Sequence, residues 1–349
     1  MLRRRAPRLA FLIGVLVVVA GCGQPLYVAR LGWEEARILW RREPIPDLLA
    51  RSDLDPALRE RFELVLAARA FADERLGFRV GQSYGTFAEV DDRGVVHVLQ
   101  AARRDRLESH TWWYPVAGRV PYRGFFDVAD AEAAGDRLAA RGLDVDVRPA
   151  IAFSTLGWFA DPLLSSTAEA SPEGVVETVL HELFHATLYV PGEPAFNESA
   201  ATFAGHRGAV AFFCDGPGAD PARCARAREA WRATQARGVV LGRLAAKLRR
   251  LYAADPPEAE RERVRARLAL RAGRALEAQR AGRATELVPP NNARLLGALL
   301  YVTDLDAFEA LAPGESDPGP ALRALVAAAN GKGDPFAQVR ALSPDDLPG

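Results

Sequence analysis

The chain has 349 residues, of which 49% are hydrophobic, so it is long enough to bury one large core or two modest ones. It contains 45 basic and 45 acidic residues, and the part beyond residue 21 has a slight acidic excess. This balance gives no indication of nucleic-acid binding, so no nucleic-acid partner is predicted.

The N-terminus is typical of a bacterial lipoprotein signal. Four arginines precede an apolar run at residues 9–20, which suits a secretion signal and is too short to span a membrane. Val19-Ala20-Gly21-Cys22 then resembles a lipobox, in which the cysteine is acylated before cleavage. The alternative is an ordinary secretion signal with a chance cysteine. We expect removal of residues 1–21 and anchoring in the bilayer through acyl chains on Cys22. Gly23, in place of aspartate, favours the outer membrane of a Gram-negative bacterium, with the protein facing the periplasm.

The next part of the chain predicts short helices and a small sheet. Asp91-Asp92-Arg93-Gly94 is a strong turn signal and predicts a hairpin between the strands on either side. Residues 151–154 are the candidate edge strand, to which a substrate backbone would add as a further strand. The predicted helices cover residues 33–40, 56–76 and 128–141. The predicted strands cover residues 84–90, 95–101, 112–114 and 143–153.

The central motif is His181-Glu182-Leu183-Phe184-His185. Ser171 and Pro172 form a helix start, and apolar residues then recur at helical spacing, which predicts a helix over 172–188. Two histidines four residues apart share one helix face, so both can reach one Zn²⁺. The glutamate between them points toward the water on the metal, which makes Glu182 the candidate general base. The pattern is a metalloprotease signature, and the alternative is a chance match on an ordinary amphipathic helix.

Glu198 is the candidate third zinc ligand. Pro191-Gly192 ends the first helix, and a second one is predicted from about 194 to 212 with Glu198 in its first turn. An antiparallel pair of helices can return this carboxylate to His181 and His185, which gives a His₂Glu site with an open fourth position. A metzincin would instead need histidine six positions after His185, where this chain has Pro191.

At these residues the chain resembles a bacterial family called putative aminopeptidases, lipoproteins with a His-Glu-Leu-x-His helix. The resemblance covers nearly the whole chain. It implies a zinc-dependent peptidase with His181 and His185 as ligands, Glu198 as the third ligand and Glu182 as general base. The shared segments, besides the central motif, are Leu188-Tyr189-Val190-Pro191-Gly192, Phe196-Asn197-Glu198, Val120-Pro121-Tyr122-Arg123-Gly124 and Ser154-Thr155-Leu156-Gly157-Trp158-Phe159-Ala160-Asp161-Pro162.

Two departures limit what the resemblance implies. The family usually has Asp-Thr before Phe-Asn-Glu, where this chain has Glu193-Pro194-Ala195. Thermolysin-like enzymes place an aspartate four residues after the third ligand to brace a histidine, and here that residue is Thr202. Tyr122 and Tyr189, together with Arg123, are candidates for stabilising the oxyanion of the transition state, although aromatic residues more often simply pack.

Beyond the second helix the sequence is helical, with predicted helices at 221–253, 257–281 and 292–310 and a loose tail over the last fifteen residues. Cys214 and Cys224 flank a turn-rich stretch and predict a disulfide in an oxidising periplasm. Two free thiols or a second metal site are the alternatives. We divide the chain into the signal (1–21), a helical segment (22–82), a catalytic region (83–213) and a helical C-terminal region (214–349).

The sequence therefore predicts an α+β protein of the zincin type, specifically a glutamate-zincin, mostly helical with a small sheet. It would cleave peptides as a zinc aminopeptidase. An aminopeptidase also needs an anionic group for the substrate's amine. The Gly-x-Met-Glu-Asn segment that serves this purpose in one large family is absent, since Met1 is the only methionine. A zinc endopeptidase and a non-catalytic lipoprotein that contains zinc are the alternatives. The presence of Glu182 argues against the second, because a structural zinc site needs no base.

Overall fold

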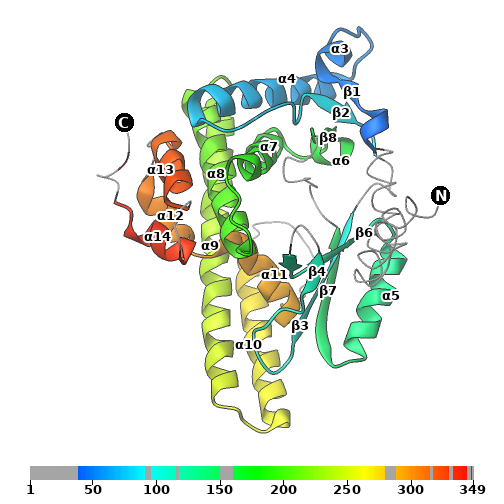
Figure 1. The fold of residues 1–349 in the computed structure, drawn as a ribbon, viewed down its shortest axis with the longest axis vertical. Coiled ribbons are helices and arrows are strands. Elements are labelled where there is room, and N and C mark those ends of the chain that lie inside the picture. The colour runs from blue at the N-terminus through cyan, green and yellow to red at the C-terminus, as the bar shows by residue number, and fades with distance from the viewer. Residues whose placement is uncertain are drawn as a thin grey trace, which may run out of the picture.

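The computed structural model describes residues 38–90, 96–114, 118–149, 160–279, 288–314, 317–329, 333–343 and 347. A body of helices makes up most of this part, and a three-stranded sheet lies beside it (Figure 1). The predicted α+β class, mostly helical with a small sheet, is confirmed. The boundaries of the predicted regions stay a prediction.

The helical body has one large hydrophobic core, built chiefly from apolar side chains of helices from both halves of the chain. No helix within the described ranges has both the length and the apolar character needed to cross a membrane. The helices are α3 (Ile45–Leu49), α4 (Pro56–Phe71), the π-helix η1 (Ala72–Leu76), α5 (Val128–Ala139), α6 (Ser165–Ala168), α7 (Pro172–Thr187), α8 (Pro194–Asp215), α9 (Pro221–Ala253), α10 (Glu258–Ala278), α11 (Asn292–Val302), α12 (Leu305–Leu311), α13 (Gly319–Ala329) and α14 (Pro335–Ala341).

The strands form three small sheets in the described residues. In the main sheet the order is β6-β3-β7, with β3 antiparallel to both neighbours. A second sheet has the order β1-β2-β8, and β4 pairs with β5 in the third. The strands are β1 (Glu43–Pro44), β2 (Thr86–Ala88), β3 (His97–Arg103), β4 (Trp112–Tyr114), β5 (Gly118–Val120), β6 (Arg123–Phe125), β7 (Leu143–Pro149) and β8 (Leu163–Leu164).

The predicted hairpin between residues 84–90 and 95–101 is wrong. The first of these strands, β2, pairs with β1 and β8, whereas β3 pairs with β6 and β7. The seven-residue register between β3 and β7 offers far more backbone hydrogen bonds than the three-residue β2 could supply. Residues 112–114 likewise form β4 of a separate sheet. The turn at 91–94 and the candidate edge strand at 151–154 lie outside the described residues.

Both faces of the main sheet are covered by helices, α5 on one side and α11 on the other. Because side chains alternate along a strand, Val145 and Val147 of β7 pack with the apolar cluster under α5. The alternate residues Asp144 and Asp146 face α11 and are only 8% and 4% exposed. The polar face of β7 is therefore a buried contact with a helix.

Helices α7 and α8 pack against each other at very short range, and glycines of α8 make this possible. A Cβ on Gly205 would lie 2.7 Å from the backbone oxygen of Glu177 and 3.0 Å from the Cβ of His181. A Cβ on Gly208 would lie 2.9 Å from Leu180. Because real Cβ atoms do not approach backbone oxygen so closely, any larger residue at position 205 would push the two helices apart. Gly205 thereby sets how close α8 comes to His181.

Two predictions about the C-terminal part need correction. The predicted helix over 292–310 is two helices, because Thr303 is extended and Asp304 has a φ of 53° in the left-handed region. The tail is also not loose throughout, since α14 begins at Pro335 and its N-cap, Asp334, accepts a hydrogen bond from the Phe336 amide. A disulfide joins Cys214, near the end of α8, to Cys224 in α9.

Candidate active site

Helix α7 carries the central motif and begins as its sequence predicts. The Ser171 hydroxyl accepts a hydrogen bond from the Gly174 amide at 3.2 Å, and Pro172 occupies the first turn. Glu173 complements the helix dipole and binds Arg226 of α9 at 2.8 Å. The helix is buried along most of its length, which holds His181 and His185 in fixed positions on one face.

The start of α8 brings Glu198 back to these histidines. Phe196 is fully buried, and the Asn197 side chain makes two hydrogen bonds, of 2.8 and 2.9 Å, to the backbone of Val190 in the connecting loop. These contacts fix the loop and the first turn of α8 relative to the end of α7. Glu198, the next residue, consequently faces the two histidines.

The three candidate ligands converge on one point. The Nε2 atoms of His181 and His185 lie 3.2 Å apart, and Glu198 Oε2 lies 3.4 Å from the first and 3.7 Å from the second. Ligand atoms bound about 2.1 Å from a tetrahedral zinc ion are about 3.4 Å from one another. Two imidazoles and a carboxylate are also a donor set that zinc prefers. Both the spacing and the chemistry of the three residues fit a zinc ion.

The charges at this point favour a cation. Burial lowers the pKa of His181, but the hydrogen bond to Glu198 and the negative charge of Glu182 outweigh it and raise the pKa to about 9. Burial raises the pKa of Glu198, and the hydrogen bonds with the two histidines overcome this and leave that pKa well below its usual range. Either a proton or a metal ion would satisfy the negative charge held between the two rings.

Glu182 lies beside the three candidate ligands and is not among them. Burial raises its pKa, the charges of His181 and His185 oppose that shift, and the carboxylates of Glu198 and Asp161 reinforce it. Asp161 is only 4% exposed and follows a segment of the chain that the structure does not describe. Glu182 thus sits among charged groups of both signs, close to the point where the ligands meet.

The two tyrosines suggested by the sequence differ in their placement. Tyr122 is partly buried, and burial together with the charges of Glu198 and Glu182 raises its pKa. Tyr189 is 40% exposed, and burial and Glu198 raise its pKa as well. The charge of the candidate ligand Glu198 therefore acts on the hydroxyls of both tyrosines.

Sequence reasoning missed two further tyrosines. Tyr84 is 4% exposed, and its pKa is raised by burial and by the charges of Glu182 and Asp161. Its φ of 58° is an unusual backbone conformation for a tyrosine, and that feature is invisible in the sequence. Tyr301 stacks on His181 from α11, and nothing local to its sequence marks it. His206 instead contacts Thr234 of α9, so it stands apart from the ligand group.

A comparison with known families places the chain. The model of a family described as putative aminopeptidase matches residues 26–319, which is most of the chain. The chain belongs to this family. Membership suggests peptidase activity and a peptide substrate, and the match includes every candidate residue of the site from Tyr84 to Tyr301. No curated protein and no solved structure matches the chain, so the aminopeptidase family is the relationship that the comparisons give.

Proposed function

We propose that this protein is a zinc-dependent peptidase that removes residues from the N-terminus of peptides. The observation that carries the proposal is the convergence of His181, His185 and Glu198, with Glu182 close to this group but not part of it. The family supports the peptidase activity and the peptide substrate. A zincin-like arrangement of the catalytic region is part of the proposal, because the metal helix and the return of the carboxylate from the next helix follow that pattern.

In this proposal His181, His185 and Glu198 hold the zinc ion. When bound, zinc would supply Lewis-acid polarisation of the scissile carbonyl and make a water molecule acidic at neutral pH. Glu182 accepts a proton from the attacking water and passes it to the nitrogen of the leaving amine. Tyr122 and Tyr189 are the proposed donors to the developing oxyanion from the segments flanking the site.

The proposal is tested with the purified zinc-loaded protein and paired substrates. Each pair consists of a peptide or amino-acid amide with a free amine and its N-acetylated counterpart. We expect hydrolysis of the free-amine member, loss of activity with a chelator, and recovery when zinc is added back. Faster hydrolysis of acetylated peptides would instead identify an endopeptidase. If neither series is hydrolysed at full zinc occupancy, a non-catalytic zinc lipoprotein becomes the better description.

We also propose that Cys22 anchors the protein to the outer membrane through acyl chains. Cys22 lies outside the described residues, and the support is its sequence context alone. Several chains give stable binding, because each buried CH₂ contributes about 0.8 kcal/mol. We expect a fatty-acid label to enter the wild-type protein, which partitions with membranes, and to be absent from Cys22→Ser. An equal label in the variant would contradict the anchor.

A further inference from the structure

Helix α11, from the C-terminal part of the chain, brings a tyrosine to the candidate metal ligands. The Tyr301 ring stacks on the His181 ring, with 6.1 Å between the centroids and 25° between the planes. The side chain is partly buried, and the charges of Glu198 and Glu182 both act on its hydroxyl. Tyr301 therefore lies against one proposed ligand, and the charges of the site act on its hydroxyl.

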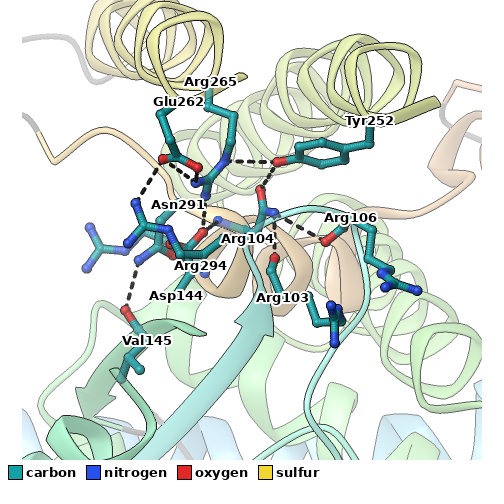
Figure 2. A network of polar contacts seen from close by, with 11 residues as sticks. Arg103, Arg104, Arg106, Asp144, Val145, Tyr252, Glu262, Arg265, Asn291 and Arg294 are labelled. Atoms are coloured by element: carbon teal, nitrogen blue, oxygen red, sulfur yellow. Dashed lines mark hydrogen bonds and ion pairs between the residues drawn. The ribbon is translucent and has the colours of Figure 1, made fainter. Parts of the chain in front are cut away.

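The first half of α11 is held by polar contacts with the main sheet. The Asp144 carboxylate accepts a hydrogen bond from the Asn292 amide at 2.9 Å, and Arg294 donates to Asp146 at 2.8 Å. Arg265 of α10 binds the same Asp144, as Figure 2 shows. The helix N-terminus and the guanidinium offset the desolvation cost of this buried carboxylate. These contacts therefore fix the helix against β7.

The second half of α11 is fixed by close packing and by a serine next to a proposed ligand. Gly297 approaches the Gln100 side chain so closely that a Cβ at this position would overlap it. At the end of the helix the Ser199 hydroxyl donates to the Leu300 carbonyl at 2.8 Å and accepts from the Thr303 amide at 3.0 Å. Ser199 is fully buried and directly follows Glu198, so the turn that carries Tyr301 is tied to the residue beside a ligand.

We propose that Tyr301 is a catalytic residue whose hydroxyl donates a hydrogen bond to the scissile carbonyl oxygen as that oxygen becomes an oxyanion. The inference rests on the proposed peptidase function and adds α11 to helices α7 and α8, which carry the proposed ligands and Glu182. The stacking contact by itself would suit a purely packing role for the ring. The stacking on His181, on a helix fixed at both ends, places the phenol ring at the proposed metal site, and the charges of Glu198 and Glu182 act on its hydroxyl, which favours the catalytic role.

The test compares Tyr301→Phe with wild type in the full, zinc-loaded protein. Phenylalanine keeps the ring and its stacking on His181, so zinc content and thermal stability should be unchanged. Loss of one oxyanion donor typically lowers kcat by about 10²–10³-fold, and we expect a fall of that order with a smaller change in KM. Tyr114→Phe, the same change on the two-stranded sheet of β4 and β5, is the matched control and should behave as wild type.

A binding measurement makes the result independent of turnover. A phosphinic peptide has a tetrahedral oxyanion in place of the scissile carbonyl, so calorimetry on the zinc-loaded proteins should show a Kd raised by a comparable factor in Tyr301→Phe. Equal kcat and equal Kd in wild type and Tyr301→Phe would overturn the role of Tyr301 and leave the peptidase function standing. A lower zinc content in Tyr301→Phe would also overturn it, because it would identify a structural support of His181. If wild type hydrolyses nothing, the peptidase proposal fails, and the binding comparison still decides whether the hydroxyl contacts the oxyanion.

Discussion

Glu182→Gln is expected to retain zinc and fold while losing nearly all peptidase activity. Glutamine has the same shape as glutamate and cannot accept the proton from the attacking water. General-base assistance contributes about 10²–10⁴-fold, so kcat should fall by at least that order. The measurement is hydrolysis of the free-amine substrate series at saturating zinc, together with the metal content of each protein.

Glu173→Gln is the matched control for this variant. It makes the same chemical change in the same helix, nine residues earlier, or about 13 Å along the axis at about 1.5 Å per residue. Its carboxylate pairs with Arg226 of α9 at 2.8 Å, and Glu173 is not one of the candidate ligands. We expect a modest loss of stability and unchanged kcat. Equal hydrolysis by Glu182→Gln and wild type would remove the catalytic role of this glutamate.

The second large effect concerns the metal itself. His181→Ala and His185→Ala should each lose zinc, because each removes one of the three proposed ligands and leaves Glu198 with a single imidazole. Changes in groups that only orient a ligand cost about 10–100-fold in metal affinity, so loss of a ligand should cost more than about 10²-fold. Glu198→Ala should weaken binding too. Metal analysis after dialysis at fixed free zinc measures the effect.

His206→Gln separates loss of a ligand from the general effect of losing a partly buried histidine. His206 lies on the same helix as Glu198, and its Nε2 is 3.0 Å from Thr234 Oγ1. A glutamine can keep that hydrogen bond, and zinc content should equal that of wild type. Full zinc occupancy in His181→Ala or His185→Ala would show that the metal binds elsewhere.

Elements whose ends are marked by local chemistry could be predicted closely. Ser171-Pro172 and Asp220-Pro221 each combine a capping side chain with a first-turn proline, and α7 and α9 begin where these pairs predict. The ligand motif could also be read directly, because its spacing of four residues is a property of one helix. For α7 and α9 the local signal was sufficient, because the physical cause of each helix start lies within a few residues of it.

Pairing and burial between distant segments could not be predicted in the same way. The alternating pattern of β7 suggests that Asp144 and Asp146 face solvent, and only the docking of α11 makes that face interior. Tyr301 lies in an apolar helix whose sequence indicates nothing beyond packing. The break at Thr303 and Asp304 depends partly on Ser199, which lies about a hundred residues earlier in the chain. In each case the determining partner is far away in sequence.

The fixing of α11 at both ends has a consequence for the order in which the molecule assembles. Helices α7 and α8 are neighbours in the chain, so the proposed ligands need only a short loop to meet. The contacts that place α11 span much longer stretches of chain. Asn292 and Asp144 are separated by 148 positions in the sequence, and Leu300 and Ser199 by 101. Closing such long loops costs more chain entropy. We therefore expect a growing or refolding chain to form its metal-binding pair first and to dock Tyr301 late. On this order, and with the function proposed above, a partly folded molecule would bind zinc before Tyr301 reaches the site, so metal binding would precede full activity during folding.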